Sequence, residues 1–158
     1  MPSEFALTEK QVRNLLSKLK MSGIKRKVLQ ELELLIIDEI SMVRADIMDE
    51  IDVILRHFRF RYNEPFGGVQ LICIGDLYQL SPVAIPEEWS VLASYYPTPY
   101  FFDSQVITNH PLQYLEFDKV FRQSDVTFIQ LLNAVRDNRL TSNESAILQK
   151  CVQPAFDL

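Results

Sequence analysis

The sequence is poor in residues that mark several classes of protein, and each shortage excludes one of them. Its two cysteines, Cys73 and Cys151, and two histidines, His57 and His110, lack the spacing of a zinc site. No apolar run approaches the roughly 18 residues that cross a bilayer, and the N-terminus, MPSEFALTEK, has no signal-peptide core. We therefore expect no membrane contact and a reducing location, cytoplasmic as in bacteria or otherwise intracellular.

Glycine is also scarce, and the positions of the glycines exclude a phosphate-binding loop. Such a loop needs glycines and a Gly-Lys-Ser/Thr ending, because bare backbone N–H groups and a lysine must surround the phosphates. None of the four glycines is followed by lysine: Gly23, Gly67, Gly68 and Gly75. The 158 residues therefore contain no loop of this type.

The composition is that of a folded domain. Hydrophobic residues make up 47% of the chain and charged residues 23%, which argues against a disordered segment. At this length we expect one domain over residues 1–158. The net charge of −5 argues against a broad electrostatic hold on DNA. Two basic stretches, 18–27 and 56–61, fit solvated faces better than phosphate-contacting patches.

Two short apolar runs frame a helix in the first half of the sequence. Residues 34–37 and 69–74 are apolar on both faces, which favours inner strands of a parallel sheet. Between them, residues 46–58 show helical spacing, with acids early and basic residues late, as the helix dipole favours. Strand, helix and strand in this order predict a βαβ unit, and hence an α/β fold with a mainly parallel sheet and flanking helices.

The remaining elements are predicted from periodicity, turn residues and capping signals. Further helices are expected at residues 8–20, 25–30, around Trp89, 125–136 and after a capping box at 141–144. Short strands are expected at residues 100–102 and 114–117. The helix over residues 125–136 is expected to bury Phe128, Leu132 and Val135.

Both apolar strands end in carboxylates. Asp38-Glu39 follows the first strand and Gly75-Asp76 follows the second. In open parallel sheets, ligands bind at the carboxyl ends of the strands. There, Asp38 can hold Mg²⁺, a hard cation that takes carboxylate and water oxygens, and Glu39 can orient a water for attack on a phosphoryl group. The alternative is that these acids cap the following helix.

Two further side chains fit the same chemistry. Gln79 lies just beyond the second strand, where its amide can hydrogen-bond to a γ-phosphate or its water without adding charge. Arg122, in Val-Phe-Arg-Gln, can stabilise charge on a transferring phosphate. The alternatives are a surface glutamine in a turn and a surface arginine paired with Asp118 or Asp125. Together, two acid-tipped strands and Gln79 favour a nucleotide-hydrolysing sheet.

The sequence resembles the PIF-like, RecD-related DNA helicases of superfamily 1 in four segments: LLIIDEISM, FGGVQLICIGDLYQLSPV, PYFFDSQVI and LEFDKVFRQSDVTFIQLLNAVRDNRLT. The resemblance covers a core of about residues 32–141, preceded by a helical segment at 8–30. It implies a partial RecA-like domain of the P-loop NTPase type, from a motor that uses ATP and Mg²⁺ to unwind DNA 5′ to 3′. Roles in DNA repair, recombination and telomere maintenance are implied with it.

The resemblance also implies roles for single residues. By motif, Asp38 binds the magnesium shell and Glu39 activates water, as in a Walker B element. Gln79 senses the γ-phosphate, and Arg122 contacts it from beyond the first sheet. Ser81 stands where the family usually has proline, which is a mild departure. The larger departure is that the Walker A phosphate-loop strand and the second RecA-like domain are missing from these residues.

The missing loop has expected consequences. ATP and Mg²⁺ belong to the intact parent protein, and we expect neither to be bound by this chain nor ATP to be hydrolysed, because the strand-end acids supply only negative charge. We expect single-stranded DNA to be a partner through the parent helicase, and the missing phosphate-loop segment and second RecA-like domain to be partners too. The unpaired edge of the strand at residues 69–74 is expected to cause self-association or to be covered by the N-terminal helix.

Two alternatives from other functional classes stay open. The first is a non-enzymatic module that binds DNA or protein on a RecA-like scaffold. The second is a metal-dependent nuclease that uses Asp38, Glu39 and Asp76, although it leaves Gln79 and Arg122 unexplained.

Overall fold

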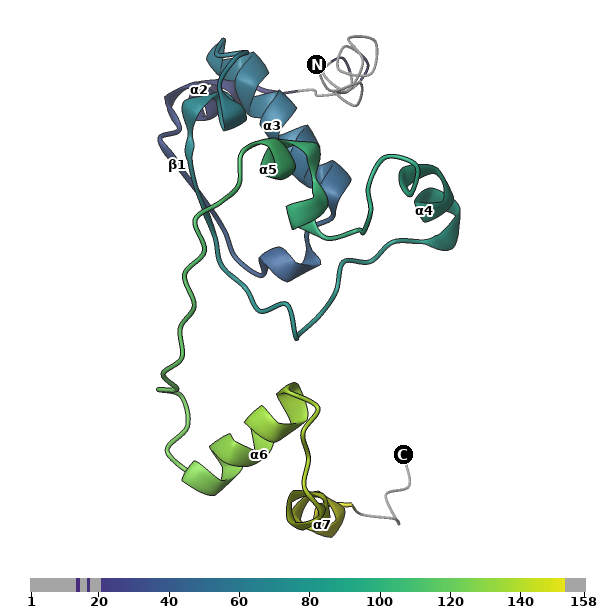
Figure 1. Ribbon diagram of the computed structural model, residues 1–158. Helices are drawn as coiled ribbons and strands as arrows, with labels where there is room; N and C mark the ends of the chain where they lie inside the picture. Colours follow the sequence, from purple (N-terminus) through teal and green to yellow (C-terminus); the bar gives the residue numbers. More distant parts are fainter. Residues whose placement is uncertain (1–13, 15–16, 18–20, 153–158) are drawn as a thin grey trace. The chain divides into compact units, whose positions relative to one another are not determined.

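The chain divides into two compact units, as drawn in the computed structural model of Figure 1. The structure describes Asn14, Ser17 and residues 21–152. The units span Met1–Gln113 and Tyr114–Leu158. The helix predicted over residues 8–20 lies outside the described residues apart from two positions, and the single domain over residues 1–158 stays a prediction.

The first unit contains the predicted βαβ arrangement (Figure 1). β1 (Leu34–Ile37) and β2 (Gln70–Cys73) pair in parallel, with Ile37 opposite Cys73. α3 (Ala45–Arg59) lies between them in sequence and has an acidic first turn and a basic last turn, as the helix dipole favours. The predicted α/β fold with a parallel sheet is therefore confirmed.

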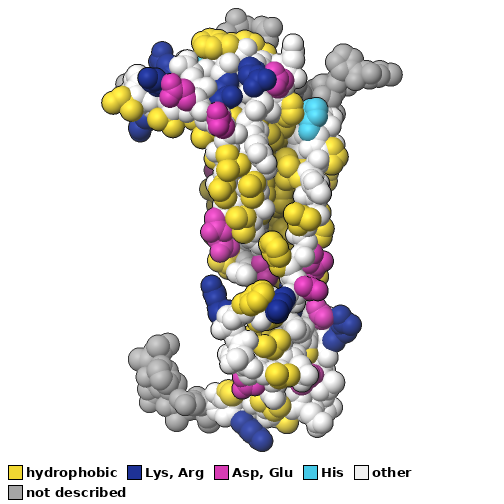
Figure 2. Space-filling model, turned by 90° about the vertical axis from the view of Figure 1, so that its left-hand side faces the viewer, with side chains coloured by type: hydrophobic (Ala, Val, Ile, Leu, Met, Phe, Trp, Pro, Cys, Tyr) yellow, Lys and Arg dark blue, Asp and Glu magenta, His cyan; other side chains and the backbone are white. Residues whose placement is uncertain are grey.

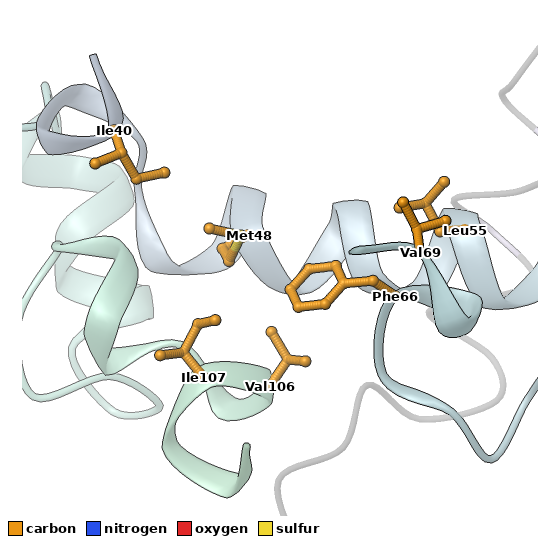
Figure 3. Packing of buried hydrophobic residues seen from close by; sticks show 7 residues of the cluster. All are labelled: Ile40, Met48, Leu55, Phe66, Val69, Val106 and Ile107. Carbon is orange, nitrogen blue, oxygen red and sulfur yellow. The ribbon is translucent and has the colours of Figure 1, made fainter. Parts of the chain in front are cut away.

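The core of the first unit lies between α3 and one face of the sheet. Because side chains alternate along a strand, Leu35 and Ile37 of β1 and Leu71 and Cys73 of β2 pack against the same buried cluster. Figure 3 shows the members of this cluster: Ile40, Met48, Leu55, Phe66, Val69, Val106 and Ile107. Met48, in the first turn of α3, has no exposed surface and is fully enclosed in this core.

The opposite face of the sheet carries apolar side chains that remain exposed. Leu34 and Ile36 of β1 are 41% and 55% exposed, and Ile72 and Ile74 on the β2 side are 38% and 50% exposed. Figure 2 views the protein from the side on which Figure 1 draws β1, and hydrophobic side chains gather there. Parallel sheets are normally covered on both faces. Within the described residues, this sheet is covered on one face only.

α2 (Gly23–Glu31) is the helix predicted at residues 25–30, and it packs against α3. Ser22 precedes it, and the Ser22 side chain accepts a hydrogen bond from the Lys25 backbone N–H at 3.4 Å. Such side-chain acceptors satisfy the N–H groups that a helix leaves unpaired in its first turn.

The basic stretch at residues 56–61 ties elements together rather than forming only a solvated face. The Arg59 guanidinium donates to the carbonyl oxygens of Gln30 (2.9 Å), Leu32 and Gly67 (2.8 Å). It thereby joins α3 to the end of α2 and to η2 (Pro65–Gly68), a 3₁₀ segment before β2. These charges are used inside the fold, which leaves fewer of them for a phosphate-contacting patch.

Short helices follow β2: α4 (Pro86–Leu92), η3 (Phe101–Asp103) and α5 (Gln105–Asn109). α4 confirms the helix expected around Trp89. The strand predicted at residues 100–102 is wrong, because Tyr100 makes only an isolated bridge with Arg44 and a 3₁₀ turn follows it. The Ser104 side chain accepts from the Ile107 N–H and so starts α5 directly after this turn. Local capping outweighs the strand preference of the aromatic residues.

The second unit contains α6 (Val126–Arg136) and α7 (Ser142–Lys150). The predicted capping box is present at the start of α7. The strand predicted at residues 114–117 is wrong in this structure, since the segment has no regular structure and no strand partner among the described residues. A strand needs a neighbour to pair its backbone N–H and C=O groups.

The predicted burial along α6 is also wrong. Phe128, Leu132 and Val135 are 43%, 48% and 47% exposed, and Leu131 is the buried residue of this helix. The helical spacing correctly marks an apolar face, but the described residues of the second unit do not cover that face. None of the helices in the described part of the chain is long and apolar enough to span a membrane.

Candidate functional site

The carboxylate-bearing ends of β1 and β2 lie at one edge of the sheet. The strands are parallel, and the Ile74 N–H donates to the Ile37 carbonyl at 2.9 Å. The Ile40 N–H then donates to the Ile74 carbonyl at 2.9 Å, which joins the two chain segments just beyond the strands. Asp38-Glu39 and Gly75-Asp76 therefore leave the sheet side by side, as the sequence predicts.

Asp38 and Glu39 are both exposed at this edge. One carboxylate oxygen of Asp38, Oδ1, accepts the Glu39 backbone N–H at 2.9 Å. Glu39 has φ 51° and ψ 43°, the left-handed conformation, and precedes the 3₁₀ segment η1 (Ile40–Met42) without a hydrogen bond from its side chain to that segment. The helix α3 is preceded by Arg44. Neither Asp38 nor Glu39 therefore caps the following helix through its side chain, as the alternative interpretation of this pair required.

Asp76 organises the turn that carries Gln79. The Asp76 carboxylate accepts the Tyr78 N–H at 3.0 Å and the Gln79 side-chain amide at 3.3 Å. The Gln79 backbone N–H donates to the Asp76 carbonyl at 3.1 Å. These bonds bring the exposed Gln79 amide onto the same edge as the strand-end acids. The structure thus places Asp38-Glu39 and the turn from Asp76 to Gln79 at the same edge of the sheet.

Arg122 belongs to the second unit and is exposed in a bend before α6. In the described part of the chain it forms no ion pair with Asp118 or Asp125, and the Asp125 carboxylate instead accepts the Phe128 N–H at 3.0 Å at the start of α6. The ion-paired surface arginine expected as the alternative is therefore not observed.

The acidic edge offers few ligands for a tightly held metal ion. Among the residues that the structure describes, no three His, Cys, Asp or Glu side chains form a group that could hold a metal ion. The three-carboxylate centre that a nuclease would need is therefore not formed by Asp38, Glu39 and Asp76.

One buried carboxylate in α3 was not predicted from the sequence. Asp49 of α3 is 7% exposed and accepts hydrogen bonds from the Tyr96 hydroxyl (2.9 Å) and from the Gln105 and Val106 N–H groups (3.0 and 2.9 Å). Burial raises the pKa of Asp49, and the backbone and tyrosine hydrogen bonds partly oppose that rise. The one feature of the sequence that could have indicated a buried carboxylate is that Asp49 follows Met48 on the apolar side of the helix.

The two parallel strands, their intervening helix and the acidic edge define the class of protein, a partial RecA-like α/β domain. The model of the PIF1-like helicase family matches residues 2–146. The chain therefore belongs to the PIF1-like helicase family, as its motifs predict.

Curated relatives give the same result. The chain is 42% identical over 115 residues to the human ATP-dependent DNA helicase PIF1, which covers 73% of this chain and 16% of the human protein. It is 39% identical over 109 residues to the ATP-dependent DNA helicase RRM3 of Saccharomyces cerevisiae, covering 69% of this chain and 14% of that protein. The chain thus spans about one-sixth to one-seventh of the length of these relatives.

Solved structures share the fold. A Pif1 helicase from Bacteroides in complex with ADP-AlF3 and ssDNA aligns with a TM-score of 0.81 and 38% identity, over 92% of this chain and 36% of that chain. Pif1 helicase from Candida albicans aligns with a TM-score of 0.74 and 30% identity, over 95% of this chain and 32% of that chain. At these identities the likeness extends to sequence as well as to fold.

Proposed function

We propose that this chain supplies the water-positioning and magnesium-binding edge of an ATP-driven DNA helicase motor. The observation that supports the proposal is the parallel pairing of β1 and β2, with Ile37 opposite Cys73, so that Asp38 and Asp76 follow strand ends at the same edge of the sheet and Gln79 is hydrogen-bonded to Asp76. Membership of the PIF1-like helicase family adds the reaction class. The activity belongs to a longer motor, in which other segments supply the phosphate-binding loop and the second RecA-like domain.

Each residue has a separate role in this proposal. Asp38 binds the hydration shell of Mg²⁺, since it is exposed and only one of its oxygens is used by the Glu39 N–H. Glu39 orients the attacking water, and the Gln79 amide hydrogen-bonds to the γ-phosphate or to that water. Arg122 stabilises charge on the transferring phosphate. Mg²⁺, when bound, neutralises charge on the phosphate oxygens.

The 158-residue chain on its own is proposed to be inactive as an ATPase. Its strand-end acids repel a triphosphate, and it has no glycine followed by lysine with which to surround one. We expect no phosphate release above the buffer rate when the chain is mixed with ATP, Mg²⁺ and single-stranded DNA. Turnover that disappears in Glu39→Gln would contradict this expectation.

The magnesium role can be tested without ATP. Mn²⁺ added to the isotopically labelled chain should broaden the amide signals of residues 38–41 and 75–79, because a paramagnetic ion at Asp38 lies at this edge. Asp38→Asn should abolish the broadening, whereas Asp118→Asn, which changes an exposed aspartate of the second unit, should leave it intact. Equal broadening in Asp38→Asn would exclude Asp38 as the ligand.

A second candidate function, a binding module, is favoured by the uncovered face of the sheet. Leu34, Ile36, Ile72 and Ile74 form an exposed apolar face beside an open strand edge. We infer that this face associates with another polypeptide or with a second copy of the chain. In sedimentation velocity, Ile36→Lys should reduce self-association, while Val91→Lys on α4 (63% exposed) should not.

Two outcomes bear on the binding-module candidate. A monomer at all concentrations would contradict self-association, and salt-dependent binding of single-stranded DNA by the chain alone would support a DNA-binding module.

A further inference from the structure

Gly75 lies directly beneath the segment that follows Glu39. A Cβ atom at position 75 would stand 3.0 Å from the Ile40 backbone nitrogen, 3.0 Å from Ile40 Cγ2 and 3.3 Å from the Ser41 nitrogen. Two of these three atoms belong to the backbone and cannot turn away. The absence of a side chain at position 75 therefore permits η1 to lie against the end of β2.

Close packing prevents η1 from shifting to accommodate a side chain at position 75. Ile40 is 4% exposed and belongs to the buried cluster, and Ser41 has no exposed surface. The Ser41 hydroxyl oxygen is buried and has no hydrogen-bond partner within the described residues. A side chain at position 75 would have to push η1 away from β2 and break the 2.9 Å bond from the Ile40 N–H to the Ile74 carbonyl.

The same segment fixes the backbone of Glu39. Glu39 is in the left-handed conformation, which is unfavourable for a residue with a Cβ atom. Three hydrogen bonds around it hold this conformation: Glu39 N–H to Asp38 Oδ1 (2.9 Å), Ile40 N–H to the Ile74 carbonyl (2.9 Å) and Met42 N–H to the Glu39 carbonyl (3.0 Å). Strained backbone of this kind persists only where the surroundings over-determine it.

We propose that Gly75 is a positioning residue for Glu39: by admitting η1 against the end of β2, it holds Glu39 in the left-handed conformation that sets the direction of its carboxylate. The proposal rests on the proposed function only for the role of Glu39 with water. The positioning itself concerns the backbone of the chain and is measurable without nucleotide or magnesium.

Nuclear magnetic resonance of the labelled 158-residue chain tests the proposal. In Gly75→Ala, we expect the Glu39 three-bond HN–Hα coupling and backbone ¹³C shifts to leave the values of the left-handed conformation. The matched control is Gly23→Ala, since a Cβ at Gly23 meets nothing within 4 Å, and it should leave Glu39 unchanged. A purely structural role of Gly75 would lower thermal stability while the Glu39 coupling and shifts stay unchanged, and that result overturns the proposal.

A second measurement applies if Gly75→Ala fails to fold. In the unmodified chain, the Ile40 amide should exchange with solvent at least about fivefold more slowly than an exposed amide, the change expected for one hydrogen bond of about 1 kcal/mol. Unprotected exchange at Ile40 would mean that η1 is not held against β2, and the proposal would fail. Either measurement leaves the proposed helicase function untouched, because neither depends on ATP, Mg²⁺ or DNA.

Discussion

Replacing the buried Asp49 tests how the first unit holds its elements together. Asp49→Ala removes the acceptor for three donors, the Tyr96 hydroxyl and the backbone N–H groups of Gln105 and Val106. Tyr96 and Val106 are 8% and 5% exposed, so water cannot easily replace the lost acceptor. Each unsatisfied buried donor costs about 1–3 kcal/mol, and removing a desolvated carboxylate offsets part of that cost. We expect the free energy of unfolding to fall by about 3 kcal/mol.

Urea denaturation provides the assay. The chain contains a single tryptophan, Trp89, which lies in α4 of the same unit and reports its unfolding by fluorescence. The midpoint should fall while the dependence on urea concentration stays the same. The control is Glu31→Ala, which removes an exposed ion pair with Lys27 (3.7 Å) and should change the free energy of unfolding by less than about 0.5 kcal/mol. If Asp49→Ala is no more destabilising than this control, the three hydrogen bonds do not hold α5 against α3.

Asp49 also gives the stability a pH dependence whose sign follows from its burial. Because burial raises the pKa of Asp49, the folded chain keeps this proton to higher pH than the unfolded chain does. Between the ordinary aspartate pKa of about 4 and the raised value, the folded state binds more protons, so its stability falls as the pH rises. The difference in unfolding free energy between the chain and Asp49→Asn should therefore change across this range. A difference that is constant with pH would refute the reasoning.

Three further predictions concern other parts of the chain. Gly67→Ala should destabilise the first unit by about 2 kcal/mol in urea denaturation, since Gly67 has φ +60° and a Cβ there would lie 2.7 Å from the Leu55 carbonyl oxygen. An unchanged urea midpoint would contradict this. A thiol reagent at pH 8 should label the exposed Cys151 well before Cys73, because burial raises the pKa of the Cys73 thiol to about 11. Equal labelling rates of the two cysteines would show that Cys73 is accessible as thiolate. The backbone and side-chain hydrogen bonds from Thr141 lower the pKa of Glu144. The helicity of α7, measured by circular dichroism, should therefore fall as the pH drops through that pKa. Glu144→Gln should lose this pH dependence.

The acidic edge could be predicted from sequence because its placement follows from local pattern. Uniformly apolar runs favour parallel strands, and parallel strands end on the same side of a sheet. Asp38 and Asp76 therefore had to lie near one another once β1 and β2 paired. Asp49 could not be predicted in the same way, because Gln105 and Val106, which bind it, lie 56 and 57 residues further along the chain. Only the folded chain reveals which buried acid meets which distant N–H group.

The wrong predictions share a physical cause. Residues 100–102 and 114–117 have the aromatic side chains of strands, but strand preference reports only that a residue suits a paired, half-buried surface. In the first segment, capping by Ser104 offers the backbone nearer hydrogen-bond partners. In the second, no partner strand occurs among the described residues. Side-chain preference identifies what a segment can do, and the available partners decide what it does.

The same reasoning links the uncovered apolar surfaces to the incomplete phosphate chemistry. The outer face of β1 and β2 and the apolar face of α6 each show the periodicity of a buried surface, yet both remain exposed in the described chain. The acidic edge likewise has the groups that suit water and Mg²⁺, while the sequence lacks the glycine-lysine element that a triphosphate requires. A segment that supplied a covering helix and a phosphate loop together would satisfy the hydrophobic face and the negative edge at once. We therefore expect one polypeptide segment both to cover the sheet and to enable ATP binding. A polypeptide that stabilises the first unit without bringing basic groups to Asp38 would be evidence against this coupling.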